Sequence, residues 1–149
     1  YEQGWDVKTK PYSGMEDTLD RLAAAGVKLA VLSNKPDPFT KKMVAALLPR
    51  WQFQPVLGAR PNAPLKPDPM VALEIAQTLK IAPEKFLYLG DTATDMRTAN
   101  AAGMFAVGAA WGFRTVEELE QSGARRIVHR PAEILELLED VANTRIIRR

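Results

Sequence analysis

The chain has 149 residues, of which 46% are hydrophobic and 26% charged, proportions typical of a single soluble globular domain. Twenty basic against 18 acidic residues leave a net charge of +2, too small an excess for a nucleic-acid-binding surface. The chain has no cysteine, which excludes disulfides and thiolate metal sites and fits a reducing, cytoplasmic compartment, and no apolar run approaches the ~20 residues of a membrane span.

Helices and strands are predicted to alternate after an irregular first segment, 1–12, which lacks an initial methionine and indicates a piece of a longer protein. In chain order we expect a helix over 15–25, a strand over 27–32, a helix over 39–48, a strand over 53–58, a helix over 70–79, a strand over 86–89, a helix over 96–102, a strand over 105–107, a short helix to 121, a strand at 127–128 and a last helix from 131. This alternation favours an α/β fold, a doubly wound parallel sheet with helices on both faces.

Polar residues just before the helices are candidate N-caps, because their side chains can accept the free backbone N–H groups of a first turn. These candidates are Ser13, Asp37, Asp68, Thr92 or Thr94, and Thr115. Gly26 and Gly103 are predicted to end the helices that precede them.

The predicted strand over residues 27–32 runs directly into Ser33 and Asn34. A hydroxyl and an amide at the carboxyl end of a buried strand lie at the edge where open α/β sheets bind ligands. The N-terminus of the next helix points at the same edge and favours an anion. Taken alone, Ser33 and Asn34 can also be a simple turn ahead of a helix cap.

Lys66 lies in a loop that prolines stiffen on its C-terminal side, since Pro67 favours an extended backbone at Lys66 and Pro69 opens the next helix. A lysine held in this way can act as a point charge on a phosphate oxygen. A solvated loop lysine is the alternative interpretation.

Two carboxylates, Asp91 and Asp95, follow the predicted strand over residues 86–89. Gly90 permits a sharp exit from the strand, which places Asp91 at its carboxyl end and Asp95 in or beside the first helical turn. Two oxygen donors close together suit Mg²⁺, whereas two acids stabilising the helix dipole are the alternative. Asp91 and Asp95 are predicted to lie at the same edge of the sheet as Ser33, Asn34 and Lys66. We therefore expect these side chains to surround one phosphate.

The order of these motifs resembles the haloacid dehalogenase (HAD) superfamily of phosphohydrolases, in its phosphoglycolate-phosphatase-like branch, over about residues 11–138. Val31–Lys35 looks like the second family motif, whose Ser or Thr holds the phosphoryl group. Lys66–Pro69 is similar to the third, whose Lys balances charge, and Leu89–Asp95 to the fourth, whose acids hold Mg²⁺.

The resemblance implies a Mg²⁺-dependent phosphatase that hydrolyses a small phosphomonoester through an aspartyl-phosphate, with no nucleic-acid or membrane partner. The implied catalytic residues are Ser33, Lys66 and Asp91. The implied phosphate-binding residues are Ser33, Asn34 and Lys66, and the implied metal ligands are Asp91 and Asp95.

The first family motif, a D-x-D-G-T strand with the nucleophile, has no counterpart here, and the substrate-selecting cap domain is also missing. We expect residues 1–12 to be a remnant of the linker from the cap, 13–142 the C-terminal part of the core domain, and 143–149 a basic tail. The family's nucleophile strand lies in the middle of its sheet. Its absence should therefore leave a gap between strands 27–32 and 86–89, and the 149-residue chain should be inactive.

Two other functions stay open on the sequence. A phosphomutase of the same superfamily retains all the motifs seen here and differs in the cap. A non-catalytic phosphate-binding or interaction module would lack a nucleophile altogether.

Overall fold

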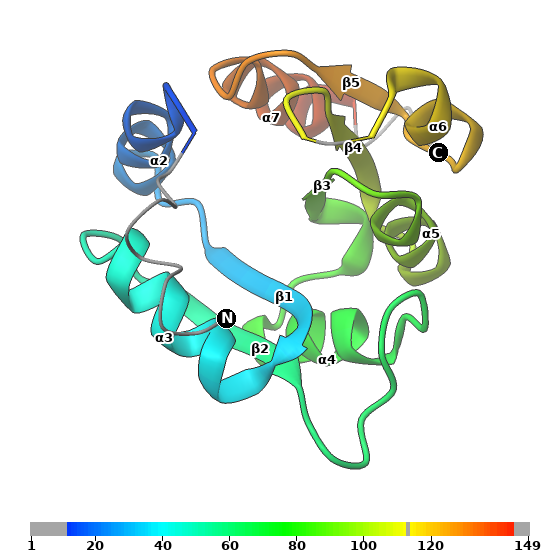
Figure 1. Cartoon of the computed structure of the whole chain (residues 1–149). Coiled ribbons are helices and arrows are strands. Elements are labelled where there is room, and N and C mark those ends of the chain that lie inside the picture. Colours follow the sequence, from blue (N-terminus) through cyan, green and yellow to red (C-terminus); the bar gives the residue numbers. More distant parts are fainter. Residues whose placement is uncertain (1–11, 113, 145–149) are drawn as a thin grey trace.

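The computed structural model describes residues 12–112 and 114–144. Most of the expected linker remnant and of the basic tail lies outside these residues. Within them the chain follows the predicted alternation of helices and strands, and Figure 1 shows their arrangement. The elements are α2 (Met15–Ala24), β1 (Leu29–Pro36), α3 (Asp37–Leu47), β2 (Phe53–Ala59), α4 (Met70–Leu79), the 3₁₀ helix η1 (Pro83–Lys85), β3 (Leu87–Gly90), α5 (Ala93–Ala102), β4 (Phe105–Ala109), α6 (Val116–Gln121), β5 (Arg126–Val128) and α7 (Glu133–Thr144).

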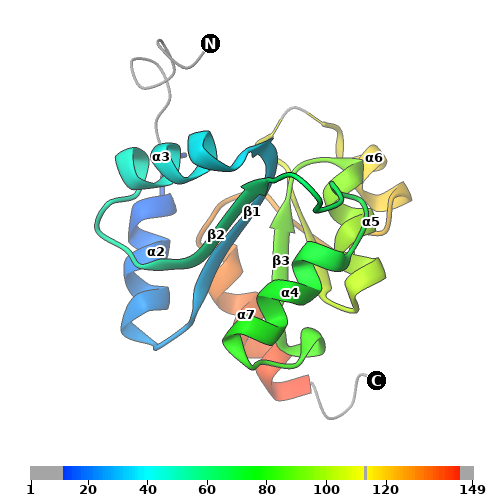
Figure 2. The ribbon, with the colours of Figure 1, turned by 90° about the horizontal axis from the view of Figure 1, so that it is seen from below.

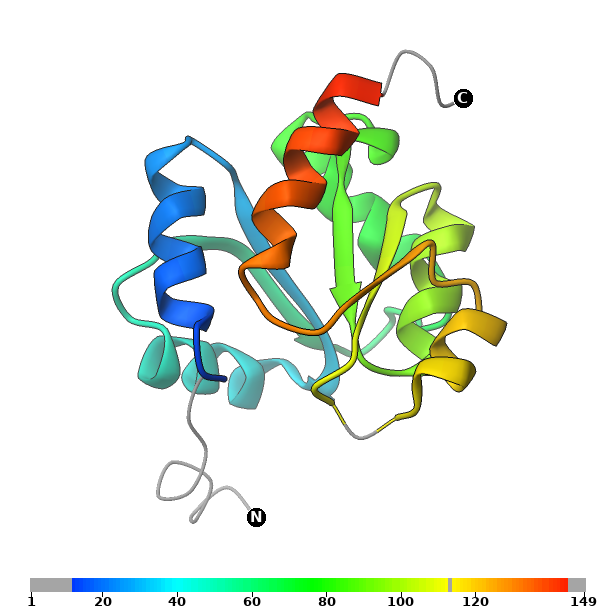
Figure 3. The same cartoon turned by 90° about the horizontal axis from the view of Figure 1, so that it is seen from above.

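The strands form two parallel sheets with helices on both faces. One sheet pairs β1 with β2, and the other has the order β3-β4-β5. Seen from one side, α4 and α5 lie in front of the strands (Figure 2), and from the opposite side α2 and α7 do (Figure 3). The predicted α/β fold with helices on both faces is confirmed. Among the described helices, none has both the length and the apolar character that crossing a bilayer requires.

The predicted gap between the first and third strands is confirmed. In the described part of the chain, β1 bonds only to β2 and β3 only to β4, so each has one edge without a strand partner. A cavity of about 840 Å³ lies between these two strands, with mostly apolar walls from β1, β3, α2 and α7. The cavity-lining residues include Leu19, Leu22, Val31, Leu87, Ile134 and Leu138.

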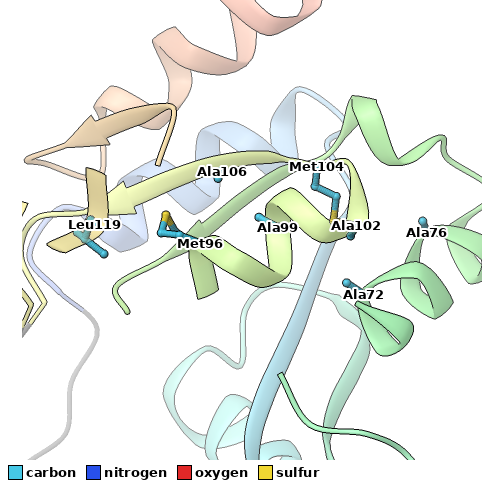
Figure 4. Packing of buried hydrophobic residues seen from close by; sticks show 8 residues of the cluster. All are labelled: Ala72, Ala76, Met96, Ala99, Ala102, Met104, Ala106 and Leu119. Atoms are coloured by element: carbon cyan, nitrogen blue, oxygen red, sulfur yellow. The ribbon is translucent and has the colours of Figure 1, made fainter. Parts of the chain in front are cut away.

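The largest buried cluster packs α5 between β4 and α4, as Figure 4 shows. Small side chains at the helix contact, Ala72 and Ala102 among them, let α4 and α5 approach closely, while Met96 fills the space toward β4. Met96 and Ala99 are completely buried. This packing fixes the first turn of α5, which carries Asp95.

Two of the predicted N-caps are wrong. Ser13 does not cap α2: Gly14 holds that position at φ 87°, and no side chain bonds to the free N–H groups of the first turn. Asp37 is the first residue of α3 rather than its cap, because its carboxylate accepts the N–H of Gly58 on β2 at 2.7 Å. A tertiary partner here replaces the local one.

Two predicted caps are confirmed, and a third residue accepts a helix N–H from one position before the cap. Thr92 caps α5 and Thr115 caps α6, each accepting a backbone N–H at 3.1 Å. Asp68 accepts the N–H of Met70, although Pro69 is the cap residue of α4. Because Thr92 is the residue that caps, α5 begins at residue 93, three positions before its predicted start.

Candidate functional site

Two parallel strands and one loop bring the predicted site residues to the carboxyl ends of β1 and β3. Ser33 and Asn34 lie inside β1, which continues to Pro36 because it still pairs with Ala59 of β2. The prediction that the strand ends before Ser33 is therefore wrong. Lys66 lies in the loop between β2 and α4.

A buried ion pair joins the loop lysine to the second carboxylate. The Nζ atom of Lys66 lies 2.6 Å from Oδ1 of Asp95, and the two side chains are only 13% and 10% exposed. Thr92 accepts the N–H of Asp95 and so positions this carboxylate at the start of α5. Since solvent screens a buried pair little, the two charges hold each other firmly.

Asp95 also contacts the strand before it. Its Oδ2 atom accepts the backbone N–H of Asp91 at 3.2 Å, and the Tyr88 hydroxyl donates to its Oδ1 at 3.5 Å. Burial, and then the negative charge of Asp95, raise the pKa of Tyr88, so this phenol stays protonated and remains a donor. Sequence reasoning missed Tyr88, because a tyrosine in an apolar strand is indistinguishable from a core residue.

The carboxylate of Asp91 lies against the loop that follows β4. A Cβ atom added to Gly112 would be 2.5 Å from Oδ2 of Asp91, so the missing side chain of Gly112 leaves the space that this carboxylate uses. Next to Gly112, the ring of Trp111 stacks on Tyr12 with centroids 5.2 Å apart. This aromatic pair joins the two sides of the cavity, which both residues line.

The side chains of Asn34 and Ser33 make different contacts. Asn34 bonds to the backbone of Lys66, with Oδ1 accepting the N–H at 3.0 Å and Nδ2 donating to the carbonyl at 3.3 Å. Ser33 accepts the N–H of Lys35 at 3.0 Å, which is the local turn that the sequence also allowed. Hydrogen bonds and one ion pair thus link Asn34, Lys66, Asp95 and Asp91 into one cluster, and Ser33 neighbours it on β1.

The donor set of this cluster fits Mg²⁺ through a single well-placed carboxylate. Mg²⁺ in proteins keeps several waters and takes one or two carboxylates together with substrate phosphate. Asp91 offers hard oxygen donors beside Gly112, whereas Asp95 is already engaged by Lys66. In the described residues no group of three or more His, Cys, Asp or Glu side chains could hold a metal ion, so substrate and water would complete the shell.

The parallel strands, the helices on both faces and the polar cluster at the carboxyl ends of β1 and β3 define a Rossmann-like α/β protein, and ligands of such proteins bind at this edge. Comparison with known sequences gives the family. Residues 1–109 match the family described as haloacid dehalogenase-like hydrolase. The chain belongs to this family, which confirms the resemblance.

Curated relatives are similar over part of their length. The phosphoglycolate phosphatase of Shigella boydii serotype 4 is 36% identical over 122 residues, which cover 82% of this chain and 48% of the relative. The phosphoglycolate phosphatase of Escherichia coli strain K12 is 36% identical over 106 residues, 71% of this chain and 42% of the relative. The chain thus spans about half the length of these curated relatives.

Solved structures share the fold. A Lactobacillus delbrueckii subsp. bulgaricus protein, provisionally named a phosphoglycolate phosphatase, has a TM-score of 0.86 and 34% identity, covering 93% of this chain and 57% of that one. A β-phosphoglucomutase from Clostridium difficile has a TM-score of 0.70 and 20% identity, covering 96% and 60%. The second likeness shows the fold alone.

Proposed function

We propose that the protein to which this chain belongs is a Mg²⁺-dependent phosphatase that hydrolyses a small phosphomonoester, with phosphoglycolate as the first substrate to test. The buried Lys66–Asp95 pair carries the proposal, since it fixes an ammonium group next to Asp91 at the carboxyl ends of parallel strands. The names of the curated relatives support the choice of substrate.

Four of the five predicted site residues have a proposed role in the reaction. Lys66 neutralises negative charge that develops on the phosphoryl oxygens. Ser33 donates its hydroxyl proton to one of these oxygens, because its oxygen accepts from Lys35 while the proton stays available. Asp91 would hold Mg²⁺, and Asp95 orients Lys66 and the backbone of Asp91. A bound Mg²⁺ would polarise the phosphoryl group.

The proposed nucleophile is an aspartate outside these 149 residues, because the sequence contains no D-x-D-G-T segment. It would attack the phosphorus and release the alcohol of the substrate, which gives an aspartyl-phosphate that water then hydrolyses to aspartate and inorganic phosphate. We therefore propose that the 149-residue chain has no activity alone. The division into cap linker, core and basic tail, the cytoplasmic location and the absence of nucleic-acid and membrane partners stay predictions.

An assay of the intact protein on phosphoglycolate, with and without Mg²⁺, tests the proposal. Asp91→Ala should lower kcat/KM about 100-fold or more and remove the dependence on Mg²⁺, whereas Asp17→Ala, at an exposed site on α2, should change neither. Unchanged Mg²⁺ dependence in Asp91→Ala would overturn the assignment of Asp91. Turnover by the 149-residue chain alone would show that its own residues supply the nucleophile.

Product analysis with a sugar phosphate as the substrate separates the alternatives. A phosphatase releases inorganic phosphate from a sugar phosphate, whereas a mutase returns an isomeric sugar phosphate. A non-catalytic module would bind phosphate without either product.

A further inference from the structure

The side chain of Asn34 pairs with the main chain of Lys66 as one strand pairs with another. Its Oδ1 atom accepts the Lys66 N–H at 3.0 Å, and its Nδ2 atom donates to the Lys66 carbonyl at 3.3 Å. The two residues are 32 positions apart, so this contact ties the loop between β2 and α4 to the end of β1. Only one orientation of the amide satisfies both backbone groups, since exchanging its oxygen and nitrogen would oppose donor to donor.

The Asn34 amide, for which the sequence predicts phosphate binding, is engaged with the main chain of Lys66. The amide oxygen and one amide hydrogen are both committed to Lys66. A phosphate ligand in the family motif would instead direct its donors at the anion.

The lysine is held at its other end by a different element. Its ammonium group lies on Asp95 in the first turn of α5, while its main chain lies on Asn34 of β1. A long lysine side chain has many conformations, so its charge has a defined place only if the backbone that carries it is also fixed.

We infer that Asn34 is a positioning residue, whose side-chain amide fixes the main chain of Lys66 so that the lysine ammonium stays at the phosphoryl site. The inference rests on the proposed function for its catalytic consequence. Its structural part, the pairing of Asn34 with Lys66, stands independently.

The variant Asn34→Ala in the intact protein tests the inference by two measurements. Hydrogen exchange of the Lys66 amide should accelerate about tenfold, because its acceptor is gone. In phosphoglycolate hydrolysis kcat should fall about 10- to 100-fold while KM stays nearly constant, because the lysine is misplaced rather than lost. Gln77→Ala, which removes an exposed amide on α4, is the matched control and should change neither.

A double-mutant cycle distinguishes positioning from a general loss of structure. In a Lys66→Met background, Asn34→Ala should have almost no further effect on kcat, since the group that it positions is absent. An undiminished further loss would overturn the inference. So would unchanged exchange at Lys66, or a raised KM with an unchanged kcat, which is the result expected of a phosphate ligand.

The two proposals can fail separately. If the intact wild-type protein hydrolyses no phosphomonoester, the proposed function fails and the catalytic part of this inference fails with it. The exchange rate of the Lys66 amide still decides whether Asn34 holds the loop.

Discussion

Two glycines set how closely the carboxylates of the site approach the backbone around them. A Cβ atom added to Gly90 would lie 2.6 Å from Cγ of Asp95, and one added to Gly112 would lie 2.5 Å from Oδ2 of Asp91. Both distances are far inside van der Waals contact. Each carboxylate can therefore keep its place only beside a residue without a side chain.

Asp37 links the start of α3 to β2 through its charge. The Gly58 N–H at 2.7 Å and the Lys41 ammonium at 2.6 Å hold the pKa of Asp37 below its usual value. Because the folded-state pKa is lower than that of the unfolded chain, the stabilisation is present above the unfolded value of about 3.9 and is lost as the pH falls through the folded one.

We expect Asp37→Asn to lower the free energy of unfolding by about 1 kcal/mol at pH 7, and this difference from wild type to shrink below about pH 4. Urea unfolding at pH 7 and pH 3, followed by circular dichroism, measures it. Asp17→Asn, which loses only an exposed pair with Arg21, should have almost no effect at either pH. A difference for Asp37→Asn that is equal at both pH values would contradict the proposed charge effect.

Among the elements, α5 does most to shape the site, because its first turn carries Asp95 to the buried ion pair with Lys66 and Met96 into the core. Met96 is completely buried between α5 and β4 (Figure 4). We expect Met96→Ala to lower the free energy of unfolding by about 2–5 kcal/mol, since it leaves a cavity in a packed cluster.

Chemical denaturation also checks this prediction, with Met70→Ala as the matched control. Met70 is 58% exposed on α4, and its loss should cost less than about 0.5 kcal/mol. A cost below about 1 kcal/mol for Met96→Ala would show that the cluster collapses around the smaller side chain.

Helix boundaries were predictable where the signal lies within one turn of the chain. Thr92 and Asp95, whose backbone N–H the Thr92 side chain accepts, are three residues apart. Gly103 ends α5 in the left-handed conformation that is expected of a glycine there. The prediction failed for Ser13, where the backbone of Gly14 starts the helix, and for Asp37, whose partner Gly58 is distant in sequence.

The same limit applies to the site. The residue types at the strand ends indicated a phosphate and metal site, and the structure links four of the five predicted residues. Their pairing was not predictable, because Lys66 and Asp95 are 29 positions apart and Asn34 and Lys66 are 32 apart. The tertiary fold decides which polar side chains of the site become hydrogen-bond partners. The motifs in the sequence do not contain this information.

For the molecule as a whole, the space between β1 and β3 is the dominant feature. Two strand edges without partners in the described residues face a cavity of about 840 Å³ with mostly apolar walls. Open edges beside apolar surface promote association between chains.

We expect the 149-residue chain to associate at concentrations on the order of micromolar, and to bind an apolar dye in the cavity. Val31→Lys, which places a charge on the cavity wall of β1, should weaken both, whereas Leu73→Lys, at an exposed site on α4, should not. Sedimentation velocity and dye fluorescence measure the two effects. A chain that stays monomeric and binds no dye would show that the two edges close on each other in solution.

The contacts of Lys66 connect the two halves of the molecule mechanically. Its main chain is anchored on β1 and its charge on α5, which follows β3, so the lysine spans from one sheet to the other. We therefore expect an occupant of the cavity that changes the spacing of the two sheets to displace the Lys66 ammonium group as well.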